Sequence, residues 1–174
     1  MKKNLVLFGA IALIFATLGF YLSSTRQLAP QATETTAVAK LLSQTMPDAS
    51  GKPQALSQWQ GKPLVVNFWA TWCAPCVDEM PELSALQPEL TPAKIQILGI
   101  GIDSGVNIAE FATKYKITYP LYVGGMDATE LSRQLGNQAG GLPFTVIIGS
   151  DGRVRKTYLG RLKMQELKND LKAL

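Results

Sequence analysis

The feature that most constrains the fold is a pair of cysteines placed between an apolar run and an amphipathic run. The sequence LVVNFW at Leu64–Trp69 is apolar except for Asn67, which is typical of a strand covered on both faces of a sheet. Residues 76–90 carry apolar side chains at helical spacing. The motif WCAPC at residues 72–76 is therefore predicted to join a buried strand to the start of a helix.

Three interpretations of this motif are open. A structural disulfide closing so short a loop contributes only about 2 kcal/mol in the chain-entropy model. A zinc site needs further ligands, because two thiolates supply half of a tetrahedral set. A redox-active dithiol fits the position, since a helix N-terminus stabilises the Cys73 thiolate and Cys76 lies three residues on, on the same helical face. Pro75 suits an early helical position, and we favour the redox dithiol.

The composition excludes several other kinds of chemistry. The chain contains no histidine, so it lacks the usual general base near neutral pH and the commonest metal ligand. This excludes Ser-His-Asp, Cys-His and zinc-protease sites. The net charge is +4 from 17 basic and 13 acidic residues, and the basic excess lies at the two ends. No aromatic residues are interleaved with these bases, so we expect no nucleic-acid partner.

Outside the motif, strand-like and helix-like segments alternate. Residues 45–63 turn at Ser50-Gly51-Lys52-Pro53 and predict a short hairpin, and Asp151-Gly152 marks a second one. This order predicts an α/β fold with a mixed sheet. The further strands expected are Ile95–Ile102, Leu121–Val123, Pro143–Gly149 and Arg153–Leu159, and the further helices are Asn107–Tyr115, Ala128–Leu135 and Lys163–Leu171.

The N-terminal segment has the composition of a membrane anchor. Residues 5–22 contain no charge and no proline, and as a helix they would be about 27 Å long, close to the roughly 30 Å hydrocarbon core. Lys2 and Lys3 precede the run, which favours a cytoplasmic N-terminus. We expect residues 1–26 to be an uncleaved signal-anchor; a cleaved signal peptide is the alternative. Residues 27–44 are expected to be a flexible tether, compatible with a short helix around Ala37–Leu42, and residues 45–174 one domain.

The stretch VVNFWATWCAPCVDEMPEL resembles the thioredoxin superfamily, and in particular its membrane-anchored TlpA/ResA-type branch. Gly61-Lys62-Pro63 before the strand, Pro81 in the helix and Gly141-Leu142-Pro143, which resembles the family's cis-proline loop, add to the resemblance. It implies a thioredoxin fold over residues 45–174, with a mixed central sheet flanked by helices, an N-terminal β-hairpin and a central insertion. It also implies that Cys73 is the attacking thiolate and Cys76 the resolving thiol, with no cofactor beyond their disulfide and no metal.

The resemblance also directs attention to residues around the cysteines. Asn67 stands where thioredoxin has a buried Asp, and Asn cannot carry a proton. Glu79 follows Cys76 by three residues on the same helical face, where it could tune thiol pKa values and accept protons; the alternative is a first-turn acid favoured by the helix dipole. Candidate substrate-binding residues are Trp72, Leu142, Pro143 and Phe144, the last standing where many relatives have Thr. Candidate structural or redox-tuning residues are Asn67, Ala74, Pro75 and Pro81.

The function that the resemblance implies is a membrane-tethered thiol-disulfide reductase. Its domain would lie on the periplasmic or extracytoplasmic side of the inner (plasma) membrane. Its substrates would be oxidised envelope proteins such as apocytochrome c, and a membrane dithiol transporter would supply electrons. Residues 45–174 leave no room for an added dimerisation domain, and we expect a monomer. The alternatives are a thiol oxidase or isomerase, and a non-enzymatic redox-gated binding module or metal carrier.

Overall fold

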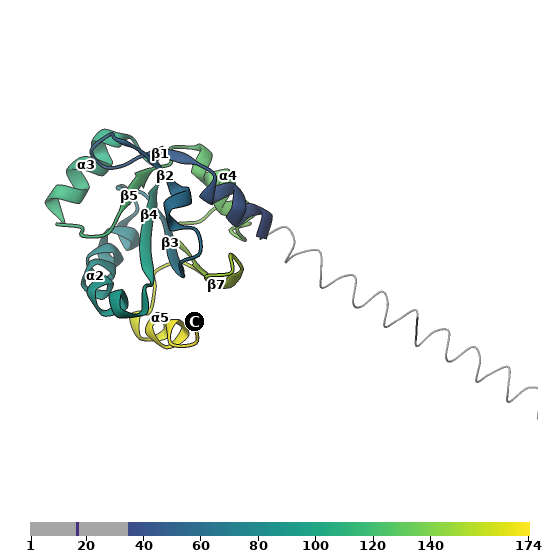
Figure 1. The fold of residues 1–174 in the computed structure, drawn as a ribbon. Helices are drawn as coiled ribbons and strands as arrows, with labels where there is room; N and C mark the ends of the chain where they lie inside the picture. Colours follow the sequence, from purple (N-terminus) through teal and green to yellow (C-terminus); the bar gives the residue numbers. More distant parts are fainter. Residues whose placement is uncertain (1–16, 18–34) are drawn as a thin grey trace, which may run out of the picture. The chain divides into compact units, whose positions relative to one another are not determined.

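The computed structural model describes residue 17 and residues 35–174 (Figure 1). The predicted anchor at residues 1–26 thus lies outside the described residues, except for Thr17. Among the residues described, no helix combines the length and apolar character needed to cross a membrane. The first half of the domain contains β1 (Thr45–Pro47), β2 (Pro53–Ala55), η1 (Leu56–Trp59), β3 (Leu64–Trp69), α2 (Ala74–Leu90) and η2 (Thr91–Ala93). The second half contains β4 (Gln96–Gly101), α3 (Gly105–Lys114), β5 (Leu121–Val123), α4 (Asp127–Gln134), β6 (Phe144–Ile148), β7 (Val154–Leu159) and α5 (Met164–Leu171).

The five strands β3 to β7 form one mixed sheet in the order β5-β4-β3-β6-β7. β3 pairs in parallel with β4, and β4 with β5, whereas β6 runs antiparallel to both β3 and β7. β1 and β2 form a separate antiparallel pair, which is the predicted N-terminal hairpin. α3 and β5 lie between β4 and α4, and we take these two elements as the expected insertion. The α/β prediction with a mixed central sheet is confirmed.

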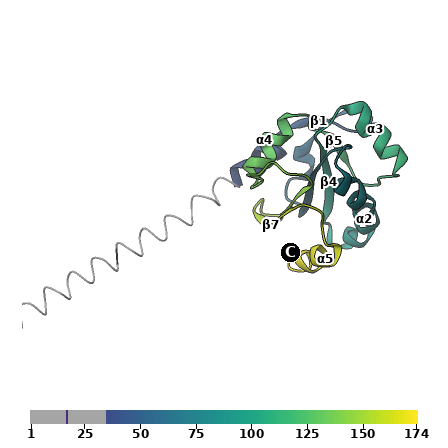
Figure 2. The same cartoon turned by 180° about the vertical axis from the view of Figure 1, so that it is seen from behind.

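Helices cover both faces of the sheet (Figures 1 and 2). On one face, buried residues of α2, α3 and α5 pack against Val65 and Trp69 of β3. On the other face, α4 and the helical residues 35–42 pack against Leu64, Val66 and Phe68. Successive side chains of a strand point to opposite faces, so Asn67 lies on the same face as Val65 and Trp69. The alternation places this one polar residue of β3 beneath α2.

The segment expected to be a tether is partly folded. Residues 35–42 are helical, and Ala37, Val38 and Leu41 are buried together with Leu56 and Leu64. The compact unit that extends to Leu174 includes this helix. The boundary that we placed at residue 45 is therefore wrong, because the apolar side of this helix completes the core beneath the sheet. The expected short helix around Ala37–Leu42 is present.

Candidate active site

The cysteine pair forms a disulfide at the beginning of α2. Cys73 is the N-cap residue of the helix, and Pro75 lies in its first turn. The carbonyl oxygen of Cys73 accepts hydrogen bonds from the N–H groups of Cys76 (3.0 Å) and Val77 (3.1 Å). The helical turn holds the two Cα atoms 5.3 Å apart and the sulfur atoms are bonded, a separation well within the range for a disulfide. The local geometry is the one that the motif predicts.

The two cysteines differ in their access to solvent. Cys73 is 5% exposed and Cys76 is fully buried, whereas the neighbouring Trp72 is 71% exposed. The small residual exposure of the pair belongs to Cys73, because the disulfide packs into the core cluster beneath α2. Trp72 is exposed beside the disulfide and Trp69 is buried.

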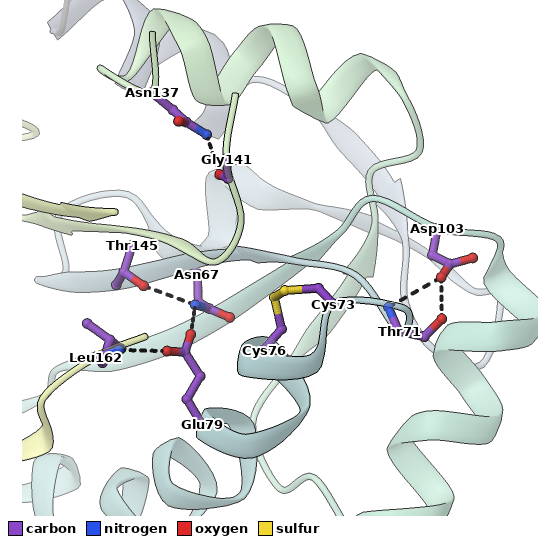
Figure 3. Close-up of a disulfide and its surroundings, with 10 residues drawn as sticks. All are labelled: Asn67, Thr71, Cys73, Cys76, Glu79, Asp103, Asn137, Gly141, Thr145 and Leu162. Carbon is purple, nitrogen blue, oxygen red and sulfur yellow. Dashed lines mark hydrogen bonds between the residues drawn. A yellow bond between two sulfur atoms is a disulfide. The ribbon is translucent and has the colours of Figure 1, made fainter. Parts of the chain in front are cut away.

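Glu79 lies one helical turn after Cys76 and is fully buried. Its Oε1 accepts a hydrogen bond from Asn67 Nδ2 (2.8 Å), and its Oε2 accepts one from the Leu162 N–H (2.8 Å), as Figure 3 shows. Asn67 Nδ2 also contacts Thr145 Oγ1 at 3.0 Å. The interpretation of Glu79 as a solvated first-turn acid is therefore wrong. Its carboxyl group is held inside the protein by donors from two other segments, β3 and the residues before α5.

Burial also changes the proton affinity of this carboxyl group. Loss of hydration raises the pKa of Glu79 to about 7, and the hydrogen bonds from Leu162 and Asn67 together with the charge of Arg161 oppose the rise. Burial disfavours the charged form of an acid. Glu79 can therefore both accept and release a proton close to neutral pH, as a general acid or base must.

The loop before β6 contains the proline that the sequence analysis singled out. The Leu142–Pro143 peptide bond is cis, as the resemblance implies. Pro143 is buried, and its C=O accepts a hydrogen bond from the Gly160 N–H (2.8 Å). Leu142 is half-buried, and within the described residues neither its N–H nor its C=O takes part in a hydrogen bond. The backbone of Leu142 is thus free to pair with another chain.

Phe144 does not lie on the surface. It is 2% exposed, and its ring packs against Phe68 with centroids 6.2 Å apart. Its assignment as a substrate-binding residue is wrong, because the first residue of β6 points into the core that α4 covers. Ala74 and Pro75 are exposed on the first turn of α2, and Pro81 lies half-buried within that helix.

Two pairs that brace the loops around the disulfide were missed by the sequence analysis (Figure 3). Thr71, two residues before Cys73, donates a short hydrogen bond from its hydroxyl to Asp103, and Asp103 also accepts a hydrogen bond from the Thr71 N–H. Burial alone would raise the pKa of Asp103, but hydrogen bonds from Thr71, Asn107 and Ser104 lower it, which keeps the acid ionised. Asn137 Nδ2 donates to the Gly141 carbonyl (2.9 Å) and steadies the proline loop. A polar residue directly after a buried strand, as Asp103 is, was the available signal.

The rim of the site carries charged residues that pair with one another. Asp78 and Glu82 are exposed, and Arg161 lies 3.5 Å from Asp78 and 2.8 Å from Glu82. A shallow groove of about 220 Å³ runs beside the motif, lined by Thr71, Val77, Asn107, Glu110, Phe111 and Tyr115 among others. In the part of the chain that is described, no three residues of the His, Cys, Asp and Glu types gather as a metal site would require.

Comparisons with known proteins agree with this geometry. The AhpC/TSA family model matches residues 37–157. Thiol-disulfide oxidoreductase ResA of Geobacillus thermodenitrificans (strain NG80-2) is 31% identical over 148 residues, covering 82% of each chain. The thioredoxin-like protein YneN of Bacillus subtilis (strain 168) is 28% identical over 126 residues, covering 70% of this chain and 71% of that protein.

A solved structure shows the same fold. It is a secreted Mycobacterium tuberculosis disulfide oxidoreductase homologous to E. coli DsbE, with a TM-score of 0.64 and 23% identity, covering 76% of this chain and 97% of the other. Fold, disulfide and relatives together define a thioredoxin-like thiol-disulfide oxidoreductase. The chain belongs to the AhpC/TSA family.

Proposed function

We propose that this enzyme reduces disulfides of other proteins outside the cytoplasm while tethered to the membrane by its N-terminal segment. The observation that carries the proposal is the arrangement around α2. The Cys73–Cys76 disulfide lies at the beginning of the helix, and the buried carboxyl group of Glu79 lies one turn behind it. This arrangement supplies a nucleophile, a resolving thiol and a proton acceptor on one element.

The reaction would proceed by two thiol-disulfide exchanges. The Cys73 thiolate attacks one sulfur of the substrate disulfide; a mixed disulfide forms, and the other substrate sulfur leaves as a thiolate. Cys76 then gives up its proton and attacks Cys73 Sγ, which releases the second substrate thiol and closes the Cys73–Cys76 disulfide. Glu79 takes up the proton from Cys76 and returns it to solvent or to the substrate. A donor dithiol restores the reduced enzyme and becomes a disulfide itself.

Substrate would bind along the proline loop and the groove beside α3. The unpaired backbone groups of Leu142 favour an extended peptide that pairs with them like an added strand. Pro143 fixes the start of β6, and Trp72 offers a large exposed apolar surface next to Cys73. Contacts of this kind are tolerant of sequence, which suits an enzyme with several protein substrates.

The membrane assignment is supported by the sequence of the N-terminal segment. The apolar run at residues 5–22 follows Lys2 and Lys3, which favours an anchor with the domain on the extracytoplasmic side, at the periplasmic face of the inner membrane. We infer that oxidised envelope proteins, apocytochrome c among them, are the substrates and that a membrane dithiol is the electron donor. The full-length chain should fractionate with membranes; recovery from cells of a soluble form lacking residues 1–26 would refute this topology.

The reduction potential tests the direction of catalysis. Thioredoxin, a reductant, has a reduction potential of about −270 mV, and the oxidant DsbA has one of about −120 mV. A buried acid behind the disulfide disfavours the thiolate, so the reduced form gains little stabilisation and the potential should lie nearer that of thioredoxin. Equilibration of the full-length chain with glutathione measures it. A value near that of DsbA would instead favour the thiol oxidase or isomerase alternative.

A further inference from the structure

Asn67 has a buried carbonyl oxygen without a partner. The side chain is fully buried, and its Nδ2 donates to Glu79 Oε1 (2.8 Å) and contacts Thr145 Oγ1 (3.0 Å). No hydrogen bond from any described residue reaches Asn67 Oδ1. Leaving a buried acceptor unpaired is destabilising, so such an atom in a native structure calls for an explanation.

The free oxygen points toward the disulfide. Asn67 lies on the face of β3 that α2 covers, together with Val65 and Trp69, and both cysteines belong to the same buried cluster. Figure 3 shows the Nδ2 group turned toward Glu79 and the Oδ1 atom turned toward the cysteines. Cys76 and Glu79 are three residues apart on α2, which is about 4.5 Å along the helix axis. An amide bonded to Glu79 is therefore within one helical turn of Cys76.

The orientation of the amide follows from its partners. When Glu79 is ionised its carboxylate only accepts hydrogen bonds, so Oε1 then requires the N–H side of the amide. Turning the amide over would place Oδ1 against the carboxylate oxygen and leave both N–H groups without this acceptor. Ionised Glu79 thus fixes Oδ1 on the side of the cysteines.

We propose that Asn67 Oδ1 accepts a hydrogen bond from the Cys76 thiol when the disulfide is reduced. The proposal rests on the proposed function, in which Cys76 is the buried resolving thiol. When a donor dithiol reduces the enzyme, two electrons and two protons are transferred, the Sγ–Sγ bond breaks and the donor closes its own disulfide. One proton stays on Cys76 Sγ, where the S–H group meets Oδ1, and the other stays on Cys73 or leaves it for solvent.

This hydrogen bond would exist in one redox state only. A disulfide has no S–H group, so Oδ1 gains its partner on reduction and loses it on oxidation. The bond therefore stabilises the dithiol form relative to the disulfide, and it keeps the proton on Cys76 while Cys73 ionises. A carboxylate at this position could take the proton from Cys76. The amide oxygen of Asn67 accepts the hydrogen bond and leaves the proton on the thiol.

Infrared spectroscopy of the Cys76 S–H stretching band tests the contact directly. In full-length Cys73→Ser protein the band reports on Cys76 alone, and a thiol that donates a hydrogen bond absorbs at lower frequency. We expect Asn67→Leu to move the band to higher frequency, both with Glu79 present and in a Glu79→Leu background, where residue 79 makes no hydrogen bond with the amide. Thr145→Val removes the other contact of the amide but leaves Oδ1 in place, so the band should not move.

An unmoved band in Asn67→Leu would overturn the proposal. A shift that is lost in the Glu79→Leu background would also overturn it, because the acceptor would then be Glu79. Asn67→Ala serves as the second variant if the leucine variant does not fold, and thermal unfolding of each variant checks that point. None of these results depends on whether the enzyme acts as a reductant, so the contact can fail while the proposed function stands.

The reduction potential provides a second measurement. We expect Asn67→Leu to lower the equilibrium constant for reduction about threefold to tenfold against a reference dithiol. At 29.6 mV per tenfold for a two-electron couple, this lowers the potential by about 15–30 mV. A double-mutant cycle with Glu79→Leu separates the direct effect from one transmitted through Glu79. If Asn67→Leu leaves the potential unchanged in the Glu79→Leu background, the direct contact is contradicted.

Discussion

Replacing Glu79 by Gln should make the stability of the oxidised protein less dependent on pH. The pKa of Glu79 is raised by burial from 4.5 to about 7, so the folded chain holds a proton that the unfolded chain releases. Stability from this group is fully present below the unfolded pKa and is lost as the pH rises through the folded pKa. A neutral Gln of the same shape has no such dependence.

The magnitude follows from the two pKa values. Linkage between 4.5 and about 7 gives a loss of about 2.5 kcal/mol of unfolding free energy from about pH 5 to about pH 8. Because Glu79 is fully buried, solvent screening does not reduce this figure. The lower limit avoids the range in which acids of lowered pKa protonate, such as Asp48, whose hydrogen bonds from Ser50 and Gln54 lower its pKa to about 2.

Urea unfolding at the two pH values measures the effect. With a slope of about 1–3 kcal/mol per molar urea, the wild-type midpoint should fall by roughly 1 M more than that of Glu79→Gln. Glu82→Gln is the matched control, because Glu82 lies on the same helix but is exposed and paired with Arg161; it should follow the wild type. If the urea midpoints of the wild type and of Glu79→Gln change equally between the two pH values, the raised pKa is refuted. In the reduced enzyme, Glu79→Gln should also lower the thiol pKa values and slow the proton-transfer step.

Three further changes have defined outcomes. Cys76→Ser should trap mixed disulfides through Cys73, as mass spectrometry would show; trapping by Cys73→Ser instead would reverse the roles. Trp72→Ala should lower kcat/KM for protein disulfides about tenfold and for small disulfides little, since its exposed ring serves docking; equal losses would argue against this. Leu41→Ala should cost about 2–5 kcal/mol of unfolding free energy because Leu41 is fully buried, whereas the exposed Lys40→Ala should change it by less than about 0.5 kcal/mol.

Local patterns predicted most of the fold. The apolar run of β3 and the helical spacing after Cys76 are signals that a few neighbouring residues carry alone. Even the short strand Leu121–Val123 was predicted with its observed bounds, because turn residues flank it. The cysteine geometry was predictable for the same reason, since three residues on a helix fix its separation.

The wrong predictions concern residues whose burial depends on tertiary contacts that the local composition does not indicate. Residues 35–42 are rich in Thr and Ala, which favours a tether, yet Ala37, Val38 and Leu41 form one apolar side that the core covers. Phe144 begins a strand next to an exposed loop, and only the pairing of β6 with β3 shows that its ring faces Phe68. Neither burial follows from the neighbouring sequence.

The hydrogen-bond partners of Glu79 could not be predicted from the sequence for a similar reason. Its hydrogen-bond donors come from β3 and from Leu162 before α5, which lies 83 positions along the chain. Asn67 and Thr145 are register partners on adjacent strands, so their meeting depends on sheet topology. Each does interrupt an apolar strand, and a polar residue in such a strand is a usable sign of a buried network.

Proton transfer at the dithiol links two features of this protein, the lack of histidine in its sequence and the burial of Glu79. A buried resolving thiol must lose its proton before it attacks, and a group that binds and releases a proton near neutral pH can take it up; an unperturbed histidine would have a suitable pKa. This chain contains none, but enclosing Glu79 between α2 and β3 raises its pKa to about 7. A histidine beside the dithiol would carry positive charge when protonated and would stabilise the thiolates, which shifts the potential toward that of an oxidant. A buried acid provides the same proton affinity with the opposite effect on the thiolates, and this suits a reductant.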